Sequence, residues 1–214
     1  METPATPALE EHERSALVAR GLRLNYLTIG YNAGEAVVAL VAGFMAGSVA
    51  LVGFGIDSVI EVSASGAAQW RLRADMHRER RAFVERWTHR IIGASFVLLA
   101  VYVAYEGGRA LWFRERPDRS PFGVALLVAS LIVMPILARA KRRVAIALRS
   151  RALASEAMQT SLCAYLSAIA FAGVLLNALL GWWWADPIAA LGMVHIIARE
   201  GIEGLRGNVR EDCC

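Results

Sequence analysis

Long apolar blocks, separated by short and mostly basic stretches, dominate the pattern of this chain. A helix needs about 20 mostly apolar residues to cross a hydrocarbon core roughly 30 Å thick, and backbone groups in lipid must be hydrogen-bonded within their own segment. The pattern therefore predicts an all-α fold, a six-helix transmembrane bundle. Four polar residues (Asp186, His195, Arg199 and Glu200) interrupt the sixth block, which is the least apolar. The predicted spans are Leu22–Phe44, Ser48–Trp70, Ile91–Trp112, Phe122–Ala138, Glu156–Leu180 and Trp184–Ile202.

Composition supports a membrane protein. Of 214 residues, 57% are hydrophobic and 20% are charged, whereas soluble domains have about 45–50% apolar and about 25% charged residues. We expect a loosely ordered cytoplasmic tail over residues 1–21, the six-span domain over 22–206 and a short cytoplasmic tail over 207–214. The first 23 residues are polar and lack the apolar core of a signal peptide.

The basic residues predict the orientation, because cytoplasmic loops carry an excess of Lys and Arg. Nineteen of the 23 basic residues fall in 14–23, 71–90, 139–151 and 199–210, which lie on one side of a six-span topology, and four fall in 109–119 on the other. We therefore expect a multi-pass protein of the cell membrane with both termini cytoplasmic, and a basic loop over 139–151. Anionic headgroups of the bilayer account for the net charge of +4, so we predict no nucleic-acid partner.

Two acidic residues lie inside the second predicted span. Asp57 and Glu61 are four positions apart, which places them on one face of a helix. An acid at the centre of a span costs about 2.5–3.5 kcal/mol on translocon scales, so a pair indicates a functional site. Two close carboxylates are stabilised by sharing a cation. The structural alternative is that each bonds a polar side chain of a neighbouring helix.

Gln159 and Cys163 form a second pair at the same spacing in the fifth predicted span. Taken alone they are also explained as a helix-to-helix hydrogen bond and a small core residue. Facing the acidic pair, they complete four donors: two carboxylates, one amide oxygen and one thiolate. Four donors suit zinc, and a thiolate disfavours magnesium and calcium. We predict a transported divalent ion and no resident cofactor. The choice among zinc, cadmium, cobalt, iron and others stays open here, because softness alone does not rank these ions.

Two further pairs are possible secondary ligands. Asn32 and Glu35 share a face of the first predicted span, where Glu35 is a proton site, a partner of a ligand, an entry ligand or the partner of an arginine. Cys213 and Cys214 are either soft metal ligands or simply the end of the chain, since two ligands are fewer than the usual four.

The order of six spans resembles the cation diffusion facilitator family. The resemblance is carried by AGSVALVGFGIDSVIE, by the pair that precedes LSAIAFAGVLLNALLGWWWADPIAAL, and by Ala185–Asp186 at the start of the sixth span. It implies proton-coupled efflux of zinc or a related ion by a homodimer, with Asp57 and Glu61 at the second-span motif. Gln159 and Cys163 stand where the family has His or Asp and then Asp, which favours softer ions. Only a few residues follow the sixth span, so we expect dimerisation to rest on the membrane portion or on the Cys213–Cys214 tail.

Two other functions fit parts of the pattern, and a third does not. A proton-coupled exporter of organic cations would also use buried acids, with a cation–π pocket formed by Tyr31, Phe54, Tyr102 and Tyr165. A sensor or scaffold would depend on the terminal cysteines instead. The four scattered histidines and the lack of a nucleophile motif argue against an enzyme.

Overall fold

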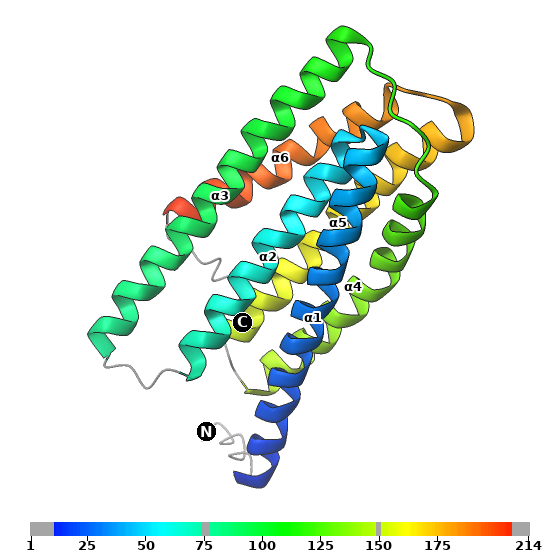
Figure 1. Ribbon diagram of the computed structural model, residues 1–214. Coiled ribbons are helices and arrows are strands. Elements are labelled where there is room, and N and C mark those ends of the chain that lie inside the picture. Colours follow the sequence, from blue (N-terminus) through cyan, green and yellow to red (C-terminus); the bar gives the residue numbers. More distant parts are fainter. Residues whose placement is uncertain (1–10, 74–77, 149–150, 207–214) are drawn as a thin grey trace, which may run out of the picture.

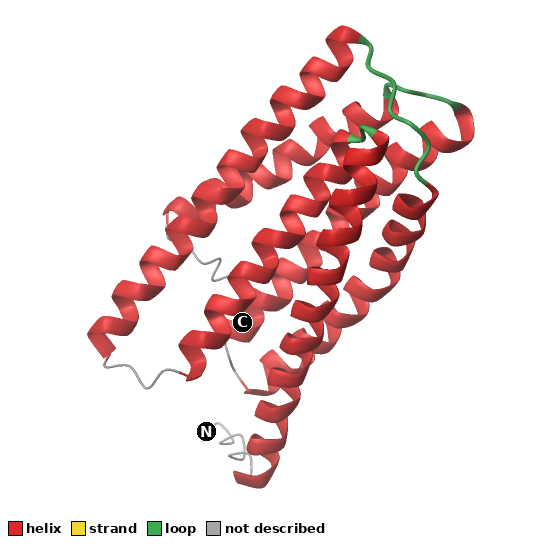
Figure 2. Ribbon diagram, viewed as in Figure 1, coloured by secondary structure: helices red, strands yellow, loops and turns green. Residues whose placement is uncertain are grey.

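Six helices make up the regular structure of the part of the chain that the computed structural model describes, residues 11–73, 78–148 and 151–206 (Figures 1 and 2). The predicted all-α, six-helix bundle is therefore confirmed. The helices are α1 Glu11–Ala46, α2 Val49–Arg73, α3 Arg78–Phe113, α4 Pro121–Leu148, α5 Arg151–Leu180 and α6 Ala185–Arg206.

Successive helices run in opposite directions through the bundle (Figure 2). Residues 47–48, 114–120 and 181–184 connect helices at one end, which we call the loop end. Helix α1 begins, and α6 ends, toward the opposite end, which we call the terminal end (Figure 1). Gly47 and Gly181, both with positive φ (64° and 67°), end α1 and α5 at the loop end, in the conformation that glycine adopts without strain.

Five helices contain segments long and apolar enough to cross a membrane: Ser15–Ala46, Val49–Gly66, Arg90–Phe113, Pro121–Leu148 and Glu156–Leu180. Helix α6 has 22 residues, or about 33 Å at 1.5 Å per residue, but its polar residues keep it out of this set. It nevertheless packs along α3 and α5 as part of the same bundle (Figure 1).

Several helices extend past the predicted spans at the terminal end. Helix α1 begins at Glu11, so the tail predicted to be loosely ordered is helical over 11–21. Helix α4 continues to Leu148, so most of the basic loop predicted over 139–151 is helical as well. The physical reason is the same in both cases: hydropathy marks where the apolar part of a helix ends, whereas Ala, Leu, Glu, Arg and Lys continue a helix into water.

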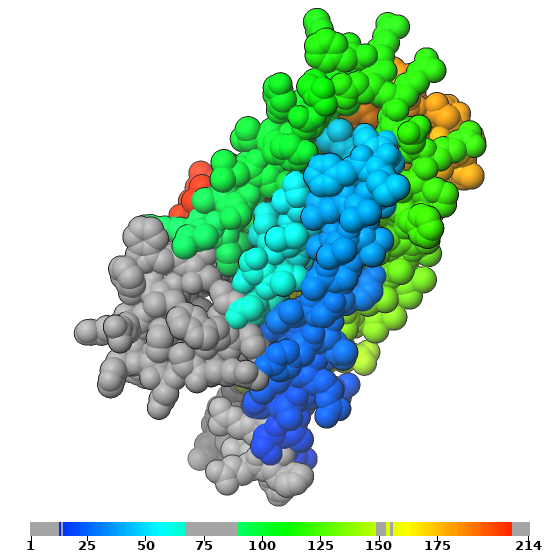
Figure 3. Space-filling view, viewed as in Figure 1, coloured from blue at the N-terminus to red at the C-terminus, as the bar shows by residue number. Residues whose placement is uncertain are grey.

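Helix α2 is the most enclosed span. In its apolar window 67% of the residues are buried, against at most 39% in the other four spans. It contacts α1, α3, α5 and α6. The outer surfaces of α1 and α3 are apolar instead, with exposed Val37, Phe44, Leu98 and Val101 (Figure 3 shows the face on which α1, α2 and α3 lie). Lipid can cover such a surface, so α2 is where polar groups are shielded from it.

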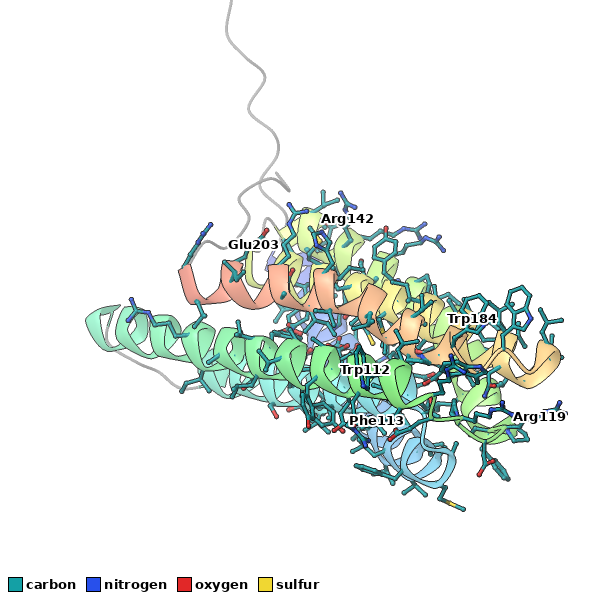
Figure 4. All side chains as sticks on the ribbon, turned by 90° about the horizontal axis from the view of Figure 1, so that it is seen from above. Trp112, Phe113, Arg119, Arg142, Trp184 and Glu203 are labelled. Carbon is teal, nitrogen blue, oxygen red and sulfur yellow. The ribbon has the colours of Figure 1, made fainter. Side chains whose placement is uncertain are left out.

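Helices α3 and α6 lie side by side (Figure 4), and glycines allow their backbones to meet. A Cβ atom on Gly93 would lie 2.6 Å from the backbone nitrogen of Leu205 and 2.8 Å from the carbonyl oxygen of Gly201. A Cβ atom on Gly201 would lie 2.8 Å from the backbone nitrogen of Val97. Small residues are a common means of close helix packing in lipid, where the hydrophobic effect does not drive association.

Candidate metal site

The acidic pair of α2 lies in the interior of the bundle. Asp57 and Glu61 are 4% and 3% exposed. The run of Val, Leu, Ile and small residues around them forms a helix that is shielded on several sides. Because Asp57 and Glu61 are four residues apart, both carboxyl groups lie on one face of this helix. The predicted placement on one helix face is therefore what the structure has.

Helix α5 brings the second pair to the same place. Asp57, Glu61, Gln159 and Cys163 all line one small cavity of about 10 Å³, together with Glu200 of α6. Cys163 is buried, at 1% exposed, and Gln159 is half-buried. The remaining wall is apolar and consists of Phe96, Leu162, Leu166, Ile196 and Ile197.

The cavity is a site to which ligands converge, not a preformed metal cage. Among the residues that the structure describes, no three His, Cys, Asp or Glu side chains come close enough together to hold a metal ion. A volume of about 10 Å³ is near the lower limit for one water molecule. The cavity therefore has room for no more than a single small ion or one water molecule.

Cys163 connects the cavity to α1. Its Sγ donates a hydrogen bond to Glu35 Oε2 at 3.9 Å, and Ser58 Oγ donates to the same oxygen at 3.0 Å. Glu35 is 2% exposed. Of the roles left open for Glu35, its contacts favour that of a partner of a candidate ligand, since it touches Cys163 without lining the cavity.

Asn32 is buried on the same face of α1, at 0% exposed. Neither its Oδ1 nor its Nδ2 has a hydrogen-bond partner among the described residues. Like Glu35, Asn32 does not line the cavity. Cys213 and Cys214 lie outside the described residues.

One polar cluster next to the cavity was not predicted. Lys141 Nζ donates to Thr160 Oγ1 at 3.2 Å and lies 3.6 Å from Glu156 Oε2. Ser65 Oγ donates to that same Glu156 oxygen at 2.9 Å. We call Lys141, Glu156, Thr160 and Ser65 the Lys141 cluster.

A signal for Lys141 was present in the sequence. The buried face of α4 runs through Gly123, Leu127, Ser130, Met134 and Ala138 at steps of three and four, and the next step falls on Lys141. The hydropathy of the run Lys-Arg-Arg places it instead in the basic loop predicted over 139–151. Helical periodicity continued past the last apolar residue distinguishes Lys141 from Arg142 and Arg143.

Asp186, the acid of the Ala-Asp dipeptide, lies at the loop end and not at the cavity. It accepts hydrogen bonds from Ser48 Oγ at 2.5 Å, from the backbone nitrogen of Val49 at 3.0 Å and from that of Ala50 at 3.5 Å. Val49 and Ala50 are the first two residues of α2. Their amide groups have no acceptor within the helix, so the Asp186 carboxylate supplies one. The arrangement ties the start of α6 to the start of α2.

Comparison with known proteins adds a family match. Residues 26–211 match the model of the cation efflux transmembrane domain. Transmembrane protein 163 of Xenopus laevis is 26% identical over 150 residues, which are 69% of this chain and 52% of that protein. An uncharacterized transporter, sll1263 of Synechocystis sp., is 25% identical over 192 residues, which are 86% of this chain and 62% of that protein. The chain thus spans about half to three-fifths of the length of these relatives.

Proposed function

Because the chain belongs to the cation efflux family, whose sequence features it shares from α1 to α6, we propose that it is a metal/proton antiporter that exports zinc or a softer divalent ion from the cytoplasm. The observation that carries the proposal is the cavity between α2 and α5. It gathers three carboxyl groups, an amide and a thiol in the interior of a multi-pass membrane protein. Membership of a transporter family also agrees with the prediction that the chain is not an enzyme.

The donor set supports the choice of ion. Asp57 and Glu61 offer hard oxygen atoms, and Cys163 offers sulfur, which binds metals as a thiolate. Such mixed sets suit zinc and the thiophilic ions, whereas magnesium and calcium prefer oxygen throughout. Glu200, which also lines the cavity, adds a further oxygen donor within reach of the same space.

Proton exchange follows from the chemistry of these ligands. Carboxyl groups and a thiol must lose their protons before they bind a metal ion, so metal and protons compete for the same atoms. We propose that the ion binds from the terminal end, which carries Arg20, Arg23, Arg142 and Arg143. The excess of basic residues predicts that this end faces the cytoplasm. Protons entering from the loop end then displace it.

The size and lining of the cavity favour a metal ion over an organic cation. A space of about 10 Å³ does not admit a drug-sized molecule. None of the four aromatic residues considered for a cation–π pocket lines it; Phe96 is the aromatic residue in its wall. Tyr165 is instead 65% exposed on the outer surface.

Three parts of the proposal extend beyond the cavity. Asn32 and Glu35 serve as secondary polar groups beside it, since Glu35 contacts Cys163 directly and Asn32 lies nearly one turn away on the same helix face. Cys213 and Cys214 are a further candidate ligand pair. The transporter acts as a homodimer, as the family resemblance implies.

Metal flux into proteoliposomes under an imposed pH gradient tests the proposal. We would compare Zn²⁺, Cd²⁺, Co²⁺ and Mn²⁺ for the wild type, Asp57→Ala and the matched control Asp118→Ala, whose side chain is exposed at the loop end. The proposal expects flux that follows the gradient in the wild type and the control and is lost in Asp57→Ala. Normal flux in Asp57→Ala would reject the site, and flux that ignores the gradient would reject antiport.

A further inference from the structure

Lys141 is a basic residue with no exposed surface. It begins a run of three basic residues in α4, and Arg142 and Arg143 are exposed, with Arg142 at the outer surface of the bundle (Figure 4). The Lys141 side chain is 0% exposed. A lysine near the end of a span ordinarily extends its ammonium group to water. Complete enclosure of this one therefore indicates a role in the interior.

A short chain of polar contacts leads from Lys141 to the cavity. Lys141 Nζ donates to Thr160 Oγ1 at 3.2 Å. The single hydrogen of that hydroxyl group is shared between the backbone carbonyl oxygen of Glu156 at 3.0 Å and Glu61 Oε1 at 3.3 Å. Glu61 lines the cavity, and Thr160 follows Gln159 in α5. The ammonium group is thus one hydroxyl group away from a carboxylate that we assign to the transported ion.

The buried positive charge of Lys141 lies close to several acidic groups. Lys141 lies 3.6 Å from Glu156 Oε2 and faces Glu61 through Thr160, so one positive charge is placed among at least two acidic groups. In a medium of low dielectric constant, a fixed charge acts strongly on a divalent ion a few ångströms away. The ammonium group compensates the carboxylates when no metal is bound and repels a metal ion that enters.

We propose that Lys141 is a tethered counter-cation that sets the affinity of the cavity for divalent metal ions. It contacts neither the ion nor its ligands directly, and so is a positioning and affinity-determining residue. Its positive charge, partly offset by Glu156, keeps binding weak enough for the ion to be released on each cycle. This inference rests on the proposed function, because it assumes that the ion binds at Asp57 and Glu61.

Three variants of the full chain test the charge argument. Equilibrium binding of Cd²⁺ and Zn²⁺ would be measured on the purified protein in detergent, with transport rates from proteoliposomes. Lys141→Met removes the repelling charge and is expected to tighten binding about tenfold and to slow turnover. Glu156→Gln leaves Lys141 uncompensated and is expected to weaken binding by a similar factor. The double variant Lys141→Met/Glu156→Gln restores the charge balance and is expected within about threefold of the wild type.

Opposite shifts in the two single variants are the result that a purely structural ion pair would not give. Unchanged affinity in Glu156→Gln, or weaker binding in a folded Lys141→Met, would overturn the inference. If Lys141→Met does not fold, Glu156→Gln and the double variant still decide, since the first must weaken binding and the second must restore it. Asp57→Ala separates this inference from the proposed function. Undiminished metal binding in Asp57→Ala rejects the proposed function itself. Lost binding in Asp57→Ala, together with unchanged affinity in Glu156→Gln, rejects only the role of Lys141.

Discussion

Ser48 and Asp186 are 138 positions apart in the sequence, and the Ser48 hydroxyl donates a hydrogen bond to the Asp186 carboxylate at 2.5 Å. The same carboxylate accepts hydrogen bonds from the first two backbone nitrogens of α2. Ser48 is the N-cap of α2, because its Oγ accepts a hydrogen bond from the backbone nitrogen of Leu51 at 3.1 Å, and Asp186 of α6 completes this cap from another helix. The cap fixes the loop end of the helix that carries Asp57 and Glu61.

Replacing Asp186 with Ala is expected to destabilise the protein without removing any residue that lines the cavity. Loss of the hydrogen bonds that cap a helix start costs about 0.5–2 kcal/mol, and the variant loses those to the backbone nitrogens of Val49 and Ala50. Ser48 also loses its buried partner. The thermal midpoint in detergent should fall clearly below that of the wild type. Asp118→Ala, the same change at an exposed position of the loop end, should leave the midpoint nearly unchanged. Equal midpoints for the two variants would contradict the capping role.

Replacing Cys163 with Ser is expected to change which ion is preferred. The substitution keeps the size of the side chain but exchanges a soft sulfur donor for a hard oxygen. Transport of Cd²⁺ should fall by about tenfold or more relative to Co²⁺ and Mn²⁺. Competition assays in proteoliposomes would measure the ratio, with Cys213→Ser/Cys214→Ser as the control that leaves the cavity intact. If the ratio of Cd²⁺ to Co²⁺ and Mn²⁺ transport changes only in the control, the soft-metal site lies at Cys213 and Cys214 and not at Cys163.

Acidification is expected to weaken metal binding, because protons and metal ions compete for the same carboxyl and thiol groups. The sign is fixed: affinity falls as pH falls through the range in which the ligands take up protons. Asp57→Asn cannot release a proton from that position, so its plot of log affinity against pH should be shallower than that of the wild type by about one unit of slope. Titration calorimetry at several pH values measures both slopes, and parallel plots would exclude Asp57 from the exchange.

Gly201→Ala is expected to separate α3 and α6. The new Cβ atom would lie 2.8 Å from the backbone nitrogen of Val97 and 3.0 Å from the carbonyl oxygen of Gly93, and a backbone cannot withdraw as a flexible side chain can. Overpacking of this kind typically costs about 1–3 kcal/mol. Gly108→Ala in α3 is the matched control, because its Cβ atom would meet nothing within 4 Å. The control should be neutral or slightly stabilising, and a similar loss in both variants would exclude the proposed helix contact as the cause.

The fold was largely predictable, because membrane spans are defined by a single strong physical requirement. Each of the six predicted blocks contains most of one observed helix. Helix ends were not predictable in the same way. Residues 11–21 and 139–148 are helical, although their polarity marks the water boundary, since a change of solvent does not end a helix whose residues favour it.

The candidate site was predicted where spacing alone determines which residues meet. A separation of four placed Asp57 with Glu61 and Gln159 with Cys163, and the structure places both pairs around one cavity. Contacts between residues of different helices cannot be predicted from spacing within one helix. Neither the bond of Cys163 to Glu35 nor the approach of Lys141 to Glu156 follows from spacing within one helix. Which faces of α1 and α4 turn inward depends on the packing of the whole bundle.

Helix α4 contains a proline, Pro135, near its middle. Proline has no amide hydrogen to bond the carbonyl group four residues earlier, here that of Leu131, and its ring crowds that carbonyl group. Helix α4 is therefore easier to bend at Pro135 than elsewhere, and Lys141 lies in the segment that follows this hinge. Bending at this hinge would withdraw the ammonium group from Glu156 and Thr160 without displacing α2 or α5. The rate of hydrogen–deuterium exchange of the backbone amides over 136–141 measures this bending. We expect Pro135→Ala to slow the exchange and a substitution at the exposed Ile132 to leave it unchanged.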